Sequence, residues 1–447
     1  MTMVNAYEPN QTAHLDSEEA TLIARRSKAL GPAYRLFYEQ PLHLVRGEGV
    51  WLWDKNGKAY LDCYNNVASV GHCHPKVVEA ISGQLGILNT HTRYLHDGVV
   101  TYAERLMATM PDGLGHVMFT CTGSEANDLA LRIARSHTRR QGVIVTSNAY
   151  HGLTEAVAEL SPSLGDFVDR GPRVQLIPAP DPHNVSPQGQ GQRLAADLAQ
   201  AIAALRKNGV EPAAFLVDTV FSSDGLYPDP AGFLKPAVDL IRTEGGIFIA
   251  DEVQAGFART GDRFWGFQRH DLTPDMVTMG KPMGNGFPVA GVAMRPELVE
   301  EFGTKARYFN TFGGNPVAAA AGMAVMDVIE DEALQANSLE IGSFLISGLN
   351  EIVAGEGIDA EVRGAGLFLA VDFNEEHEMS TPAGTLASFI VNHLRQNGVL
   401  ISATGPRGNI LKIRPPIVMQ KSEAQLLLNA MEGAFAASRQ SGQARPT

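Results

Sequence analysis

The stretch "HVMFTCTGSEANDLALRIARSHTRRQGVIVTS", residues 116–147, contains two short apolar runs separated by a polar turn and an amphipathic segment. The apolar runs have the length and composition of buried strands, and residues 124–140 between them have the spacing of a helix. Further apolar runs follow at residues 213–221, 245–253 and 275–280. Short apolar runs that alternate with helices predict a largely parallel sheet covered on both faces.

The chain on either side of this region has a different pattern. Residues 49–63 predict a hairpin of two short strands around Asn56-Gly57. The polar stretch 179–193 predicts a loop or an insertion. Beyond about residue 330, the pattern predicts a helix, two strands and a final helix at residues 331–355, 362–373, 409–418 and 422–440. We therefore expect an N-terminal segment belonging to a small domain, a large α/β domain and a C-terminal α+β small domain, at residues 1–60, 61–330 and 331–447.

Composition excludes several classes of protein. The formal net charge of -13 argues against nucleic acid or an anionic membrane as the main partner. Three cysteines are too few for a disulfide framework and indicate a reducing compartment. The N-terminus lacks the pattern of a secretory signal, and the apolar stretch 315–331 is too short to span a bilayer. We expect a cytoplasmic protein.

Three local patterns could carry chemistry. Thr122, Gly123 and Ser124 follow a strand and open a helix, where free N–H groups and the helix dipole favour an anion. A plain helix cap explains the same residues. Asp251 stands at the carboxyl end of a presumed central strand, where ligands bind in open α/β sheets. It could hold a protonated ring nitrogen or a metal, or form a structural ion pair.

Lys281 is the third pattern. It lies in "VTMGKPMGNGFPVAG", residues 277–291, among apolar residues and glycines. A desolvated lysine has a lowered pKa and can act as a nucleophilic amine, although taken alone the pattern is better explained by a lysine that reaches the surface. Metal binding is not supported, because His72 and His74 in "GHCHP" have no second ligand pair.

Together, an anion cradle, a strand-end carboxylate and a lysine in a glycine-lined pocket match the needs of pyridoxal 5'-phosphate. That cofactor requires donors for its phosphate, an acid partner for its ring nitrogen and a lysine for its aldehyde. The order of the motifs adds a resemblance. Segments from "YLDCYNNVASVGHCHPKV" through "TGSEANDLALRIAR", "NAYHG", "IADEVQAGFARTG" and "FNTFGGNPVAAAAG" to "LKIRPP" cover nearly the whole chain. The chain resembles class III aminotransferases of the fold-type-I pyridoxal-phosphate superfamily.

This resemblance implies a fold and a set of roles. The fold is a large domain with a mostly parallel, seven-stranded-type sheet and a smaller α+β domain. Lys281 forms a Schiff base with the cofactor and moves the proton, and Asp251 pairs with the ring nitrogen. The remaining cofactor contacts are Gln254 to the ring hydroxyl, Tyr150 on the ring face, and Thr122, Gly123 and Ser124 at the phosphate. His151 is expected to form hydrogen bonds behind Tyr150.

Two further roles involve the substrate and a partner subunit. Arg414 in "KIRPP" matches the arginine that grips a substrate carboxylate, a task that suits its planar fork. Thr311 would reach the cofactor phosphate of a neighbouring subunit, which implies a homodimer with shared active sites. Asp218 stands where many relatives carry a glutamate that neutralises the arginine, and Phe221 replaces a usual polar residue.

The reaction stays open between two readings. One is transfer of an amino group from a small amine, such as an ω-amino acid, to a 2-oxo acid. The other is elimination of phosphate or ammonia from a phosphorylated or phosphonate amine, because several motifs resemble the ethanolamine-phosphate phospho-lyase branch. A racemase, and a cofactor-free scaffold without activity, are the further alternatives.

Overall fold

A seven-stranded sheet lies at the centre of the computed structural model, which describes residues 5–8, 15–374 and 383–440. In spatial order its strands are β4 (His116–Thr120), β10 (Ala290–Met294), β9 (Met276–Met279), β8 (Ile247–Asp251), β7 (Pro212–Asp218), β5 (Gly142–Thr146) and β6 (Val174–Ile177). From β9 to β6 every neighbouring pair is parallel, whereas β10 runs antiparallel to both β9 and β4. The predicted mostly parallel sheet is therefore confirmed.

Alternating side chains on the central strands divide between two apolar clusters. Val143 and Val145 of β5 pack in the cluster that includes α4 (Gly123–Thr138) and α8 (Pro296–Lys305). Ile144 packs in the other cluster, with helices that include α6 (Gln190–Lys207) and α7 (Lys235–Thr243). Because both faces are covered, these strands need apolar residues at every position, which explains their unbroken apolar runs.

The other elements of this region cover or connect the sheet. Its further helices are α2 (Pro75–Leu85), α3 (Asp97–Met107), α5 (Glu155–Ala158) and α9 (Pro316–Asp331). Four short 3-10 turns are η2 (Pro162–Leu164), η3 (Pro187–Gly189), η4 (Gly266–His270) and η5 (Lys281–Gly284). The predicted loop 179–193 is correct only up to residue 189, because α6 already begins at Gln190.

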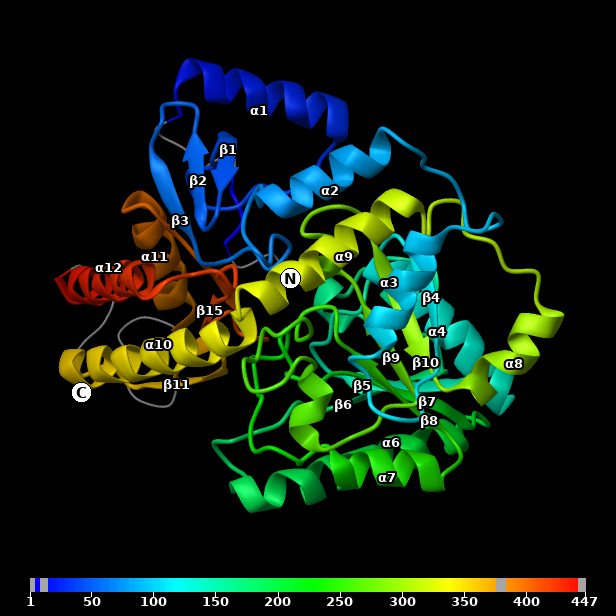
Figure 1. Cartoon of the computed structure of the whole chain (residues 1–447). Helices are drawn as coiled ribbons and strands as arrows, with labels where there is room; N and C mark the ends of the chain where they lie inside the picture. The colour runs from blue at the N-terminus through cyan, green and yellow to red at the C-terminus, as the bar shows by residue number, and fades with distance from the viewer. Residues whose placement is uncertain (1–4, 9–14, 375–382, 441–447) are drawn as a thin grey trace.

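Two four-stranded sheets lie beside the large one, and both ends of the chain contribute to them (Figure 1). The first sheet contains β1 (Leu44–Glu48), β2 (Trp51–Asp54), β3 (Ala59–Asp62) and β13 (Val399–Leu400). The second contains β11 (Ala360–Ala365), β12 (Phe368–Phe373), β15 (Ile410–Ile413) and β14 (Ser402–Thr404). Their helices are α1 (Ser17–Leu30), α10 (Leu334–Glu356), α11 (Ala383–Gln396) and α12 (Lys421–Gln440).

The predicted hairpin at residues 49–63 is confirmed as β2 and β3, which pair antiparallel. The single strand predicted at 362–373 is wrong, because the structure forms two antiparallel strands, β11 and β12. Gly366 makes the reversal: its φ of 53° lies in the left-handed region, which glycine adopts without strain.

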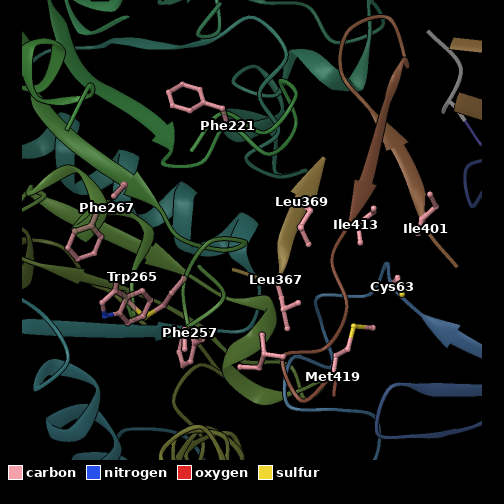
Figure 2. Close-up of a cluster of buried hydrophobic side chains, with 14 of the residues drawn as sticks. Cys63, Phe221, Phe257, Trp265, Phe267, Leu367, Leu369, Ile401, Ile413 and Met419 are labelled. Carbon is pink, nitrogen blue, oxygen red and sulfur yellow. The ribbon is translucent and has the colours of Figure 1, made fainter. Parts of the chain in front are cut away.

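One apolar cluster connects all three parts of the chain (Figure 2). It includes Val50 and Tyr60 from the N-terminal segment, Trp265 from a loop of the large sheet and Ile413 from β15. The cluster continues past residues 60 and 330, so the proposed domain boundaries at those positions stay predictions. Among the described residues, no helix combines the length and apolarity that crossing a bilayer requires.

We predict that Gly342→Ala lowers the stability of the protein. A Cβ at Gly342 in α10 would collide with the carbonyl oxygen of Gly366, at the turn between β11 and β12. Overpacking of this kind costs about 2 kcal/mol, so the midpoint of urea unfolding should fall. Gly355→Ala in the same helix is the control, because its Cβ would meet nothing within 4 Å. Equal midpoints for the two variants would contradict the close packing of α10 on this turn.

Candidate active site

A cavity of about 330 Å³ lies at the edge of the large sheet where β4, β7, β8 and β9 end. Its lining includes the predicted residues Thr122, Gly123, Ser124, Tyr150, Asp251, Gln254 and Lys281. Two predicted residues, Thr311 and Arg414, are not part of that lining. The cavity is thus at the carboxyl ends of parallel strands, where open α/β sheets bind their ligands.

The N-terminus of α4 forms the anion-binding wall of the cavity. Thr122 caps the helix: its hydroxyl accepts a hydrogen bond from Glu125 N at 3.1 Å, and Glu125 Oε2 accepts one from Thr122 N at 2.9 Å. The N–H groups of Gly123 and Ser124, at the first helical positions, have no acceptor within the helix. The predicted role of Thr122 at the phosphate stays a prediction, and its hydroxyl already contacts Glu125.

The turn after Tyr150 sets the shape of this wall. Leu153 N donates to Ser124 Oγ at 3.0 Å. Gly152 has a φ of 143°, and a Cβ there would lie 2.5 Å from Ser124 Oγ. A Cβ at Gly123 would lie 3.0 Å from Val253. The glycines therefore keep the anion-binding backbone uncovered and close to its neighbours.

Asp251 ends β8 and is held by a buried network. Its Oδ2 accepts a hydrogen bond from Asn127 Nδ2 at 3.0 Å and lies 2.7 Å from His151 Nδ1, while Oδ1 accepts from Val253 N at 3.0 Å. Thr278 Oγ1 donates to Asn127 Oδ1 at 2.7 Å, which fixes the orientation of the amide. Asp251 is only 4% exposed, so its carboxylate is oriented before any ligand binds.

The sequence analysis missed Asn127 and Thr278 and assigned His151 only a hydrogen-bonding role. A signal for Asn127 was present: it is an amide on the buried stripe of α4 that also contains Ala130 and Ala134. His151 does form a hydrogen bond, and its Nε2 is buried without a partner among the described residues. Its contact makes it a positioning residue for Asp251.

Lys281 follows β9 and reaches the same cavity. Burial lowers the pKa of its amine, the charge of Arg414 lowers it further, and the carboxylates of Asp251 and Asp218 oppose both effects. A lowered pKa makes more of the neutral, nucleophilic amine available. Of the flanking glycines, Gly286 lines the cavity, whereas Gly284 is needed because a Cβ would lie 2.7 Å from Val289.

A chain of hydrogen bonds leads away from the cavity toward β15. Gln254 Oε1 accepts a hydrogen bond from Arg414 Nη1, and Gln254 Nε2 donates to Ser222 Oγ. The Ser222 hydroxyl in turn donates to Asp218 Oδ2. The amide of Gln254 connects the arginine to Ser222, and its predicted contact with a ring hydroxyl stays a prediction.

Asp218 lines the cavity, although its carboxylate is already occupied. It accepts hydrogen bonds from Val220 N at 3.1 Å and Ser222 N at 3.0 Å as well as from the Ser222 hydroxyl. Phe221 points into the apolar core, so the polar-to-aromatic change noted in the sequence lies outside the cavity (Figure 2). Glu252 also turns away and accepts hydrogen bonds from Gly266 N and Phe267 N at 2.7 and 2.8 Å.

The remaining residues singled out in the sequence, Tyr150, Thr311, His72 and His74, do not share one site. Tyr150 is half-buried in the cavity wall, where burial raises the pKa of its phenol. Thr311 is exposed on the loop before α9. His72 and His74 contact different carboxylates, those of Asp62 and Glu332.

The mostly parallel seven-stranded sheet, with a cavity at the carboxyl ends of its strands, has the architecture of a fold-type-I enzyme. The model of the family described as aminotransferase class-III matches residues 37–435. The chain belongs to this family.

The relatives include proteins named as aminotransferases and proteins named as phospho-lyases. The chain is 39% identical over 434 residues to alanine–glyoxylate aminotransferase 2-like of Drosophila melanogaster, covering 94% of this chain and 87% of that protein. It is 36% identical to ethanolamine-phosphate phospho-lyase homolog 1 of Caenorhabditis elegans, covering 92% of each. Among solved structures, a phospholyase from Arthrobacter in complex with phosphoethanolamine superposes with a TM-score of 0.89 at 43% identity, covering 93% of this chain and 99% of that one.

We predict that Gly152→Ala weakens binding of pyridoxal phosphate by about tenfold or more, because the new methyl group would displace Ser124 and the anion-binding backbone. Titration of the apo-protein with the cofactor, followed by visible absorbance, measures the effect. Gly171→Ala is the control, since its Cβ would have open space. Wild-type affinity in Gly152→Ala would show that the turn does not shape the cradle.

Proposed function

We propose that this chain is a pyridoxal-phosphate-dependent lyase that eliminates phosphate from a small phosphorylated amine such as ethanolamine phosphate. The observation that carries the proposal is the surroundings of Arg414, which donates a hydrogen bond to the neutral amide of Gln254 and lies 5.0 Å from the ring of Tyr64. Asp218, at the position of the neutralising glutamate, is held by three donors from Val220 and Ser222. The arginine is thus left with its charge for a substrate anion.

The residues present fit the cofactor. The free N–H groups of Gly123 and Ser124 suit its phosphate, Asp251 suits its ring nitrogen, and Tyr150 lies in the cavity wall where it can cover the ring. Lys281 supplies the amine for its aldehyde. When bound, the cofactor withdraws electrons from the carbon atom that carries the substrate amine.

The chain's own residues would then carry the elimination. Lys281, as a neutral amine, would remove a proton from the carbon that carries the substrate amine. The electron pair left behind forms a carbon–carbon double bond as the phosphate departs from the neighbouring carbon. Hydrolysis of the resulting enamine gives an aldehyde and ammonia. Arg414 would hold the phosphate as it takes up the electrons of the broken carbon–oxygen bond.

Amine transfer to a 2-oxo acid is the second candidate. It is supported by the 39% identity to a protein named alanine–glyoxylate aminotransferase 2-like. Transfer would use the same lysine, which would return the removed proton to a different atom. No phosphate would leave the substrate. The two reactions differ in whether a 2-oxo acid is required for continued turnover.

The first experiment supplies ethanolamine phosphate to the purified holoenzyme without any 2-oxo acid. We predict continuous release of equal amounts of phosphate and ammonia, with the visible band of the bound cofactor retained. Lys281→Ala is the control and should lose both turnover and the lysine-linked band. A single stoichiometric conversion to the aminated cofactor, with no phosphate release, would instead establish transfer.

We also propose a homodimer. Thr311 lies on the surface beside Phe309 and Phe312, whose side chains are 40% and 68% exposed. The neighbouring segment exposes Tyr94 and Leu95 by 67% and 101%, and His91 connects the two segments by ring contacts to both Tyr94 and Phe309. Large apolar side chains gathered at one surface are typical of a protein interface.

We predict that sedimentation velocity of the holoenzyme gives a dimer, and that Phe312→Asp shifts it toward monomer with loss of activity. An active monomer would refute the shared active site. Exposed Phe167→Asp, outside these two segments, is the matched control for surface charge.

A cytoplasmic location is likewise our proposal, supported by the free thiols of Cys63, Cys73 and Cys121.

A further inference from the structure

Two cations occupy one face of β15. Ile413 points into the apolar cluster (Figure 2), so its neighbours Lys412 and Arg414 face the opposite side of the strand. Lys412 Nζ and Arg414 Cζ each lie 5.5 Å from the centroid of the Phe368 ring. The two side chains therefore lie against the same aromatic ring, outside the lining of the cavity.

Both cations are buried and have neutral partners. Lys412 and Arg414 are each 6% exposed. Lys412 Nζ donates to the carbonyl oxygen of Ser222 at 2.6 Å, and Arg414 donates to the Gln254 amide, while its Nε is buried without a partner. Within the described ranges, neither side chain has a carboxylate oxygen within 4.0 Å.

The acidic groups whose charges act on these two side chains, Asp62, Asp218 and Asp224, all have other hydrogen-bond partners, and Asp224 accepts from Thr146 and Asn148. Asp62 lies 2.7 Å from His72 Nε2 and also accepts hydrogen bonds from Tyr64 N and Asn65 N. Asp218 accepts its three hydrogen bonds from Val220 and Ser222, as described above. Burying a cation that no carboxylate contacts is costly, so this arrangement favours a neutral Lys412 in the free protein and a charged one once an anion from outside lies close to it.

Ser222 connects Lys412 to the cavity. Its carbonyl oxygen accepts from Lys412, and its hydroxyl lies between Gln254 and Asp218, both of which line the cavity. Lys412 itself is not part of the lining. It can therefore act on a bound anion through its charge and through the position of the Ser222 segment.

We propose that Lys412 is a positioning residue that adds a second positive charge to the substrate-anion subsite of Arg414 and selects an amine with a dianionic group, a phosphate monoester or phosphonate, over one with a carboxylate. This inference rests on the proposed lyase function and specifies its substrate class. A singly charged carboxylate needs one counter-charge, whereas a dianion is matched by two.

Proton uptake accompanies anion binding in this arrangement. Burial lowers the pKa of Lys412 well below its usual range, and the charges of Arg414 and Lys281 lower it further, while Asp218 and Asp224 act in the opposite direction. A bound dianion favours the charged amine and so raises that pKa. Affinity for a dianion should therefore increase as the pH falls, and the neutral residue in Lys412→Met removes this dependence.

Sulfate is the probe, because it is a dianion that does not titrate near neutral pH and takes part in no covalent step. Calorimetric titration of the holoenzyme should give an affinity for sulfate that falls about tenfold or more in Lys412→Met and is largely kept in Lys412→Arg. Acetate, a monoanion, should bind Lys412→Met and wild type within about threefold of each other. Lys421→Met is the matched control, because it removes an amine at the start of α12 that lies 5.0 Å from the Phe344 ring of α10.

The outcomes separate the two proposals. Equal loss of sulfate and acetate binding in Lys412→Met, or no rescue by Lys412→Arg in a folded protein, would overturn the role of Lys412. An unchanged pH dependence of sulfate binding in Lys412→Met would do the same. Failure of the wild type to release phosphate from ethanolamine phosphate, with sulfate binding still dependent on Lys412, would overturn the lyase function and leave the dianion subsite standing.

Discussion

The register of three parallel strands determines where this active site can be. Asp218 of β7 pairs with Asp251 of β8, and Asp251 pairs with Thr278 of β9, so three polar side chains meet at one edge of the sheet. Lys281 follows three residues after Thr278 and therefore enters the same space. A shift of one residue in any of these strands would turn its polar side chain to the opposite face, since side chains alternate along a strand.

The carboxylate at the centre of this row is kept in place by side chains from two other elements. Asn127 comes from α4 and His151 from the turn after β5, and both contact the same oxygen of Asp251. The helix whose N-terminus presents Gly123 and Ser124 to an anion thus also orients the acid. One rigid helix, α4, would therefore position the groups at both ends of a bound cofactor. This arrangement favours a site whose geometry is fixed before the cofactor binds.

Much of the fold and of the cofactor pocket could be predicted from the sequence, because the signals were local. The apolar runs around residues 116–147 and the turn at Thr122 depend on neighbours in the chain, and the structure confirms both. The position of Gln254 could not be predicted in this way, since its amide is occupied by Arg414, 160 residues further on. The same is true of Lys412, which is an ordinary strand residue in sequence and is set apart only by its burial against Ser222.

Strands from the N-terminal and C-terminal parts of the chain share one sheet, and this affects how the protein folds during its synthesis on the ribosome. β3 pairs with β13, and Cys63 O accepts a hydrogen bond from Arg414 N, so early and late residues complete one another. The subsite on β15 cannot form until these last strands have emerged. Contacts between residues so distant in sequence are slow to form. Until they form, the apolar face of the hairpin of β2 and β3 stays uncovered. The nascent chain therefore lacks the proposed subsite, and exposes apolar surface that is prone to aggregation, until β13 and β15 have been synthesised.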